Sequence, residues 1–67
     1  MKNYITIFVK DDPKIDKFLM VRSQLKGLSM NHDCSVRIAV TDGFDGINFF
    51  RVKNTFTEIE QFMNRVE

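Results

Sequence analysis

The side chains best suited to chemistry lie together at His32, Asp33 and Cys34. A histidine near a cysteine can take up the thiol proton and leave a nucleophilic thiolate. Cys34, however, opens an alternating row with Val36 and Ile38, and a thiol buried in apolar surroundings is inert. We therefore expect no catalysis here. A zinc site shared by two copies of the chain, each supplying His32 and Cys34, stays open as an alternative.

A second candidate is the segment Asp42-Gly43-Phe44-Asp45-Gly46, in which two carboxylates flank a pair of glycines. A calcium loop needs oxygen ligands at alternate positions and a distal glutamate, and here Phe44 occupies such a position. The composition favours a hairpin turn instead. Phe44 at its tip is then a candidate binding residue, since an exposed aromatic side chain can fill a pocket on a partner.

The remaining paired carboxylates, Asp11 with Asp12 and Glu58 with Glu60, lie where helix caps and helix surfaces are expected. Neither pair needs a catalytic explanation. The sequence shows no assembled catalytic set, no metal motif and no cofactor motif. We therefore predict a protein that is not an enzyme and that binds no cofactor and no metal.

The distribution of charge indicates a binding surface. Three stretches alternate in the manner of β-strands: Lys2–Lys10, Cys34–Thr41 and Ile47–Lys53. They contain five basic residues and no acidic ones, while the nine acidic residues of the chain lie elsewhere. Strand alternation places these bases on one face together with exposed aromatic rings. The predicted binding residues on this face are Lys2, Tyr4, Phe8, Arg37, Phe49, Arg51 and Lys53.

Two ligand classes fit such a face. Protein interfaces favour Tyr, Phe and Arg, which makes contact with another protein the preferred hypothesis. Single-stranded nucleic acid is the alternative, because bases stack on aromatic rings while Lys and Arg follow the phosphates. Four-stranded RNA-recognition domains also carry stacking aromatics on their first and third strands. Their basic-Gly-aromatic-Gly-aromatic signature is absent here, since the third stretch reads Gly46-Ile47-Asn48-Phe49-Phe50-Arg51-Val52.

Two helices are expected between and after these strands. Asp12-Pro13 resembles a helix start, and Lys26-Gly27 resembles a helix end. Thr55-Phe56-Thr57-Glu58 matches a capping box, in which threonine and glutamate side chains satisfy free backbone amides. The apolar positions at strand and helix spacing form the predicted core: Ile5, Ile7, Val9, Ile15, Phe18, Leu19, Leu25, Val36, Ile38, Val40, Phe50, Val52, Phe56, Ile59, Phe62 and Met63.

The predicted element order is therefore β-α-β-β-α. We expect an α+β fold with a three-stranded antiparallel sheet in the order 1-3-2 and both helices on one face. This order resembles a ferredoxin-like unit that lacks its fourth strand. The outer edge of the first strand would be unpaired, and an open edge invites pairing with another chain. Self-association, for example as a homodimer, is therefore expected.

Size and composition limit the remaining possibilities. A chain of 67 residues has room for a single domain with a small core, spanning residues 1–67. Its net charge of +1 gives no global attraction to nucleic acid or membranes. The lone cysteine and the lack of an apolar leader or membrane span favour the cytoplasm. Free-standing proteins of this size are often inhibitors, antitoxins or viral (phage) modulators, which gives a prior for regulation of a larger macromolecule.

Overall fold

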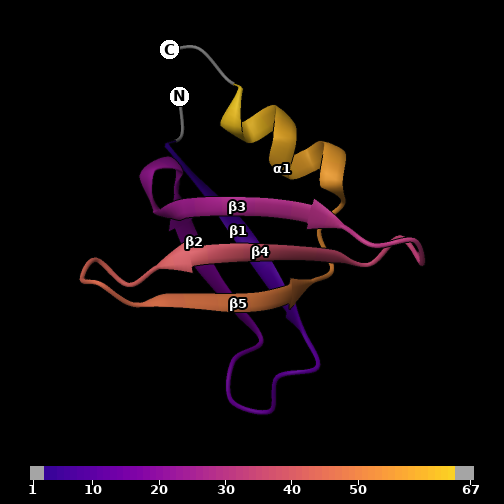
Figure 1. Cartoon of the computed structure of the whole chain (residues 1–67), viewed down its shortest axis with the longest axis horizontal. Coiled ribbons are helices and arrows are strands. Elements are labelled where there is room, and N and C mark those ends of the chain that lie inside the picture. The colour runs from indigo at the N-terminus through magenta and orange to yellow at the C-terminus, as the bar shows by residue number, and fades with distance from the viewer. Residues whose placement is uncertain (1–2, 65–67) are drawn as a thin grey trace.

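The computed structural model describes residues 3–64 of the chain. Within that range the strands form a five-stranded antiparallel sheet in the order β2-β1-β5-β4-β3, with one short α-helix (Figure 1). The elements are β1 (Tyr4–Lys10), β2 (Lys17–Val21), a 3-10 turn η1 (Arg22–Gln24), β3 (Leu25–Met30), β4 (Val36–Thr41), β5 (Ile47–Val52) and α1 (Phe56–Met63). The predicted three-stranded sheet with two helices is therefore wrong.

The error lies in the segment expected to form the first helix. Asp12 does accept backbone hydrogen bonds as a helix cap would, from the amides of Lys14 at 2.8 Å and Ile15 at 3.2 Å. No helix follows, because Phe18 and Met20 alternate into the core as residues of β2. A short apolar run cannot be assigned to helix or strand by periodicity alone. The side chain of Asp12 does cap backbone amides, but it does so in the turn of the β1–β2 hairpin and not at the start of a helix.

The expected helix stop at Gly27 is also wrong. Gly27 lies within β3, beside a register shift between Leu25 and Gly27 in the pairing with β4. A methyl group at Gly27 would meet the Cβ of Ala39 at 3.4 Å, which is an ordinary van der Waals contact, so close packing does not require a glycine here. The segment from residue 17 to residue 30 is therefore two strands joined by the corner η1.

The new strands change the edges of the sheet. β2 pairs with β1 along Tyr4 to Phe8, so the edge that was expected to be open is occupied. The outer strands of the sheet are instead β2 and β3. The predicted neighbours of the three original stretches are confirmed, since β1 adjoins β5 and β5 adjoins β4.

In the second half of the chain, the predicted hairpin and the predicted helix agree with the structure. β4 and β5 form a hairpin from Thr41↔Ile47 to Val36↔Val52, and the amide of Asp42 donates to the carbonyl of Gly46 at 3.2 Å. The hydroxyl of Thr55 accepts a hydrogen bond from the amide of Glu58 at 3.1 Å and caps α1. No helix among the described residues is long and apolar enough to cross a membrane.

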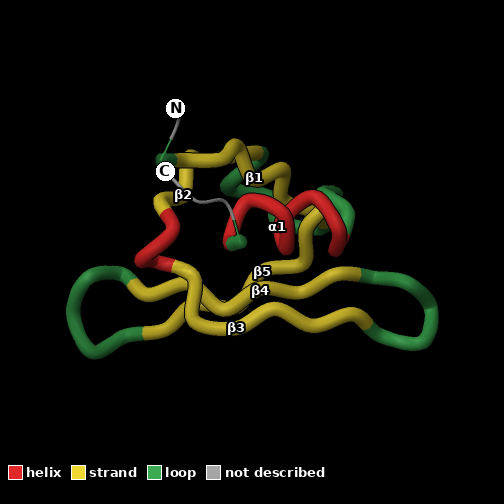
Figure 2. Tube along the Cα trace, turned by 90° about the horizontal axis from the view of Figure 1, so that it is seen from above, coloured by secondary structure: helices red, strands yellow, loops and turns green. Residues whose placement is uncertain are grey.

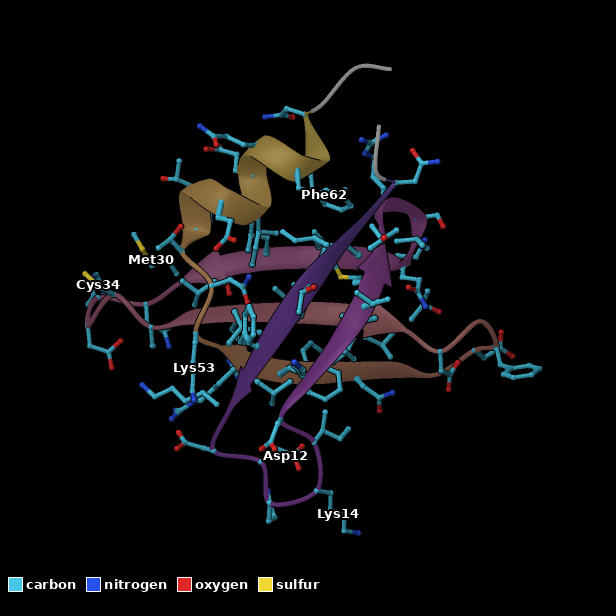
Figure 3. The ribbon with its side chains drawn as sticks, turned by 180° about the vertical axis from the view of Figure 1, so that it is seen from behind. Asp12, Lys14, Met30, Cys34, Lys53 and Phe62 are labelled. Atoms are coloured by element: carbon cyan, nitrogen blue, oxygen red, sulfur yellow. The ribbon has the colours of Figure 1, made fainter. Side chains whose placement is uncertain are left out.

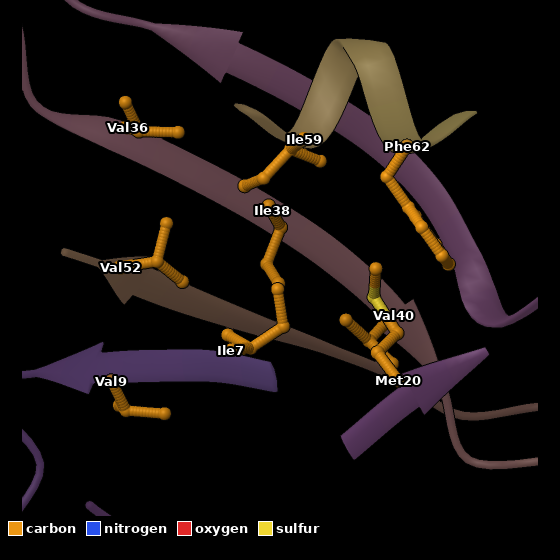
Figure 4. Packing of buried hydrophobic residues seen from close by; sticks show 9 residues of the cluster. All are labelled: Ile7, Val9, Met20, Val36, Ile38, Val40, Val52, Ile59 and Phe62. Carbon is orange, nitrogen blue, oxygen red and sulfur yellow. The ribbon is translucent and has the colours of Figure 1, made fainter. Parts of the chain in front are cut away.

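The sheet folds into two layers. The β1–β2 hairpin crosses over one face of the β3-β4-β5 layer, and α1 lies on the same side as the hairpin (Figure 2). The core fills the space between the layers, with fully buried side chains at Ile7, Met20, Ile38 and Ile59 (Figure 4). Arg22 in η1 fastens α1 to the corner, because its Nε donates to the carbonyl of Phe62 at 3.3 Å and its guanidinium lies over the Phe62 ring.

Most of the predicted core is confirmed, with two exceptions. Ile15 and Leu19 are exposed, because their segment is a turn and a strand rather than a helix. Met20 is fully buried in their place. The buried apolar cluster consists of Ile7, Val9, Met20, Val36, Ile38, Val40, Val52, Ile59 and Phe62, and the other predicted core residues are half-buried against it.

The two layers are joined at a short seam. β1 pairs with β5 only at Val9↔Val52 and Lys10↔Arg51. Beyond this point the side chain of Asn54 continues the ladder: its Oδ1 accepts from the amide of Phe8 at 2.8 Å, and its Nδ2 donates to the carbonyl of Thr6 at 3.0 Å. Asn54 is buried, so one side-chain amide replaces a lost step of strand pairing.

Candidate functional site

The structure divides the predicted binding face into two surfaces. Tyr4 and Phe8 lie on the outer side of the β1–β2 hairpin, whereas Arg37, Phe49 and Arg51 lie on the outer side of β4 and β5. Because each layer buries its inner side in the same core, these outer sides point away from each other (Figure 2). Lys53 is exposed just beyond β5, and Lys2 lies outside the described residues.

The first surface is apolar, and we call it the hairpin face. It consists of Tyr4, Phe8, Leu19 and Val21, whose exposed fractions run from 41% to 60%. The register brings them together across two strands, since Tyr4 pairs with Val21 and Leu19 pairs with Thr6, between Tyr4 and Phe8. Side chains on one face of such a pair lie about 5 Å apart when directly opposite. The four side chains therefore form one continuous apolar patch.

A shallow groove adjoins this patch. It has a volume of about 430 Å³ and lies between β1 and α1, where Tyr4 and Phe8 face Glu58, Gln61 and Phe62. The hairpin face thus continues into a concave strip with an acidic residue on its helical wall. Apolar patches that are rimmed by polar side chains mark interaction sites on proteins.

Sequence reasoning identified only half of the hairpin face. The helix that the sequence predicts between Asp12 and Gly27 would place Leu19 in the core, so the exposure of Leu19 and Val21 is not predicted. The signal was present in the alternation of Lys17, Leu19 and Val21 against Phe18 and Met20. The alternation of so short a run does not by itself distinguish a strand from a helix, and the pairing with β1 decides between them.

The second surface, the sheet face, carries cations in strict register. Lys10 pairs with Arg51, and Arg51 pairs with Arg37, so three adjacent strands place a basic residue at the same level. We call these three residues the basic row. Ser29 of β3 continues the row on the far side of Arg37. The sequence predicts that the bases share a face, and the register places Lys10, Arg51 and Arg37 in one line.

Next to the basic row lies Phe49, with 68% of its surface exposed. Across the strands from it are Ala39 and Gly27, which carry almost no side chain. The result is a depression of about 290 Å³, with Phe49 at one wall and Ser29 and Arg37 at the other. The sheet face therefore combines a line of positive charge with an exposed ring and an open backbone floor.

The acidic residues near this face neutralise it only in part. Asp11 approaches Arg51 at 3.9 Å, and both side chains are more than half exposed. Such a surface pair contributes about 0–1 kcal/mol. Among the described residues Arg37 has no ion pair. The pKa of Asp33 is lowered, chiefly by hydrogen bonds from the Ser35 hydroxyl and amide, with a smaller contribution from the charge of Arg51.

The loop residue Phe44 is placed as predicted, at the tip of the β4–β5 hairpin. Its side chain is 87% exposed and does not fold back onto the sheet. The amide of Phe44 donates to Oδ1 of Asp42 at 2.8 Å, so the carboxylate shapes the turn. Gly43 has a φ of 89°, which favours glycine at this position.

Cys34 is not where the sequence placed it. It lies in the turn before β4 with a φ of 69°, and its thiol is exposed rather than part of the apolar row (Figure 3). His32 is exposed in the same turn. Across residues 3–64, no group of three or more His, Cys, Asp or Glu side chains is placed to hold a metal ion. The turn is organised by Asp33, whose carboxylate accepts from the Ser35 hydroxyl at 2.6 Å.

Comparison with family models, with curated proteins and with solved structures found no match for this chain. Its function must therefore be argued from the two surfaces themselves.

Proposed function

We propose that this chain is a non-enzymatic binding protein that acts by contact with another protein through the hairpin face. The observation that supports this proposal most strongly is the cross-strand cluster of Tyr4, Phe8, Leu19 and Val21, all exposed on one side of β1 and β2. An exposed apolar cluster is unfavourable in water and gains free energy when a partner covers it. Its two aromatic residues, Tyr4 and Phe8, are of a type that is enriched at protein interfaces.

Self-association remains part of the proposal, but on a different edge. β2 is an outer strand and lies directly beside the hairpin face. A second copy could pair with it and cover Leu19 and Val21 at the same time, which combines backbone hydrogen bonds with apolar burial. The cytoplasmic location and the role as an inhibitor, antitoxin or viral modulator stay predictions.

The test compares two matched variants, Leu19→Ser on the hairpin face and Ile47→Ser on the sheet face. Both residues are exposed aliphatic strand residues, so the changes remove similar apolar area. Sedimentation at increasing concentration detects a second copy, and affinity capture from nuclease-treated host extract detects other proteins. We expect Leu19→Ser to abolish the contact and Ile47→Ser to leave it. Equal behaviour of the two variants, or no partner and no self-association at all, would contradict the proposal.

A further inference from the structure

The basic row is an arrangement that the fold alone does not require. Like charges directly opposite each other on neighbouring strands are destabilising. Here the arrangement occurs twice in succession, at Lys10↔Arg51 and Arg51↔Arg37. One exposed ion pair, to Asp11, relieves it at a single point. An anionic ligand lying across the row would remove the repulsion along its whole length.

The surroundings of the row restrict the class of anion. Phe49 and Arg51 are two residues apart on β5 and point to the same side, which places them about 7 Å apart along the strand. The depression beside Phe49 has Gly27 and Ala39 in line with the ring and Arg37 beside them, so a flat group can lie against the ring next to a cation. The ligand should therefore carry a negative charge and a flat ring about one residue row apart.

We infer that the sheet face binds single-stranded nucleic acid, with phosphates along the basic row and one base stacked on Phe49. Positive side chains that follow the backbone and aromatic side chains that stack bases are the usual means of single-strand binding. A duplex would keep its bases stacked on one another and away from the ring. An acidic protein segment could use the cations but would give Phe49 no stacking role. The hairpin face meets the basic row at its Phe8 end, since Phe8 and Lys10 lie on the same side of β1, whereas its other end, at Tyr4 and Val21, lies away from the row.

The experiment measures fluorescence anisotropy of a short labelled poly-dT strand while the protein is titrated, at several salt concentrations between about 50 and 200 mM. Arg37→Ala and Arg51→Ala should each lower the salt slope by about one unit, as expected for loss of one phosphate contact. Phe49→Ala should weaken binding about 5- to 150-fold, while Phe49→Tyr should keep most of it because the ring remains. Circular dichroism confirms that each variant is folded.

Two matched controls locate the site. Lys17→Ala removes one positive charge from the hairpin layer, and Tyr4→Ala removes one ring from the end of the hairpin face that lies away from Lys10. Neither should change oligonucleotide affinity by more than about 2-fold, since surface changes away from a contact have small effects. The inference is overturned by absence of binding at the lowest salt, by equal competition from duplex DNA, or by binding that survives both Phe49→Ala and Arg37→Ala. It is also overturned if poly-glutamate binds as tightly and Phe49→Ala has no effect, which would indicate an acidic protein ligand.

Discussion

A single asparagine carries much of the connection between the two layers. Asn54 lies between β5 and the cap of α1. Its side-chain amide bonds to the backbone of Thr6 and Phe8 where strand pairing has stopped. No periodicity or motif marks such a residue, because its role depends on where β1 and β5 diverge. Residue-scale chemistry of this kind follows from the assembled fold and not from local sequence.

Replacing this amide should be costly. In Asn54→Ala the amide of Phe8 and the carbonyl of Thr6 lose their partners in a part-buried setting, which costs about 1–3 kcal/mol. A domain this small has only about 3–5 kcal/mol in total. Asn48→Ala, on the exposed part of β5, is the control and should change stability by less than about 0.5 kcal/mol. Urea denaturation measures both, and equal midpoints for the two variants would show that the Asn54 bridge contributes nothing.

At the scale of elements, the sequence predicts best where the local signals agree with the pairing of the strands. The β4–β5 hairpin had alternation and a glycine-rich loop, and α1 had a capping threonine with apolar residues at helical spacing; both are confirmed. The segment from Asp12 to Gly27 carried cap-like and stop-like residues around an apolar run, and these local signals favoured a helix. In the structure this segment instead forms β2, which pairs with β1, and that pairing depends on contacts outside the segment. The hairpin face was half missed for the same reason.

Two adjacent residues of β2 distinguish the strand from the expected helix. Met20 is fully buried and Leu19 is largely exposed, although a helix would have placed Leu19 in the core. Met20→Ala should therefore cost about 2–5 kcal/mol. Leu19→Ala should cost less than about 1 kcal/mol, since little buried area is lost. Thermal or urea unfolding measures the pair, and a larger loss for Leu19→Ala would contradict the assignment of β2.

At the scale of the whole molecule, the two layers depend on each other. The hairpin supplies Ile7 and Met20, and the β3-β4-β5 layer supplies Ile38, and all three side chains are fully buried in the shared core. The strand seam is only two residue pairs long, so hydrogen bonds alone would hold the layers weakly. The burial of apolar side chains between the layers must supply the remaining stability. One small core thus supports both the apolar hairpin face and the basic sheet face.

It follows that the chain should unfold as one cooperative unit and not layer by layer. Native-state hydrogen exchange should give the amides of Ile7 and Ile38 the same opening free energy, equal to that of global unfolding. Asn54→Ala should lower both values by the same amount, although its hydrogen bonds touch only β1. If instead the β1 and β2 amides exchanged through a separate, cheaper opening while Ile38 stayed protected, the hairpin would be a detachable element. Each face could then be presented without the other. Ligand binding at the hairpin face would no longer stabilise β4 against exchange, whereas it must do so if the chain unfolds as a single unit.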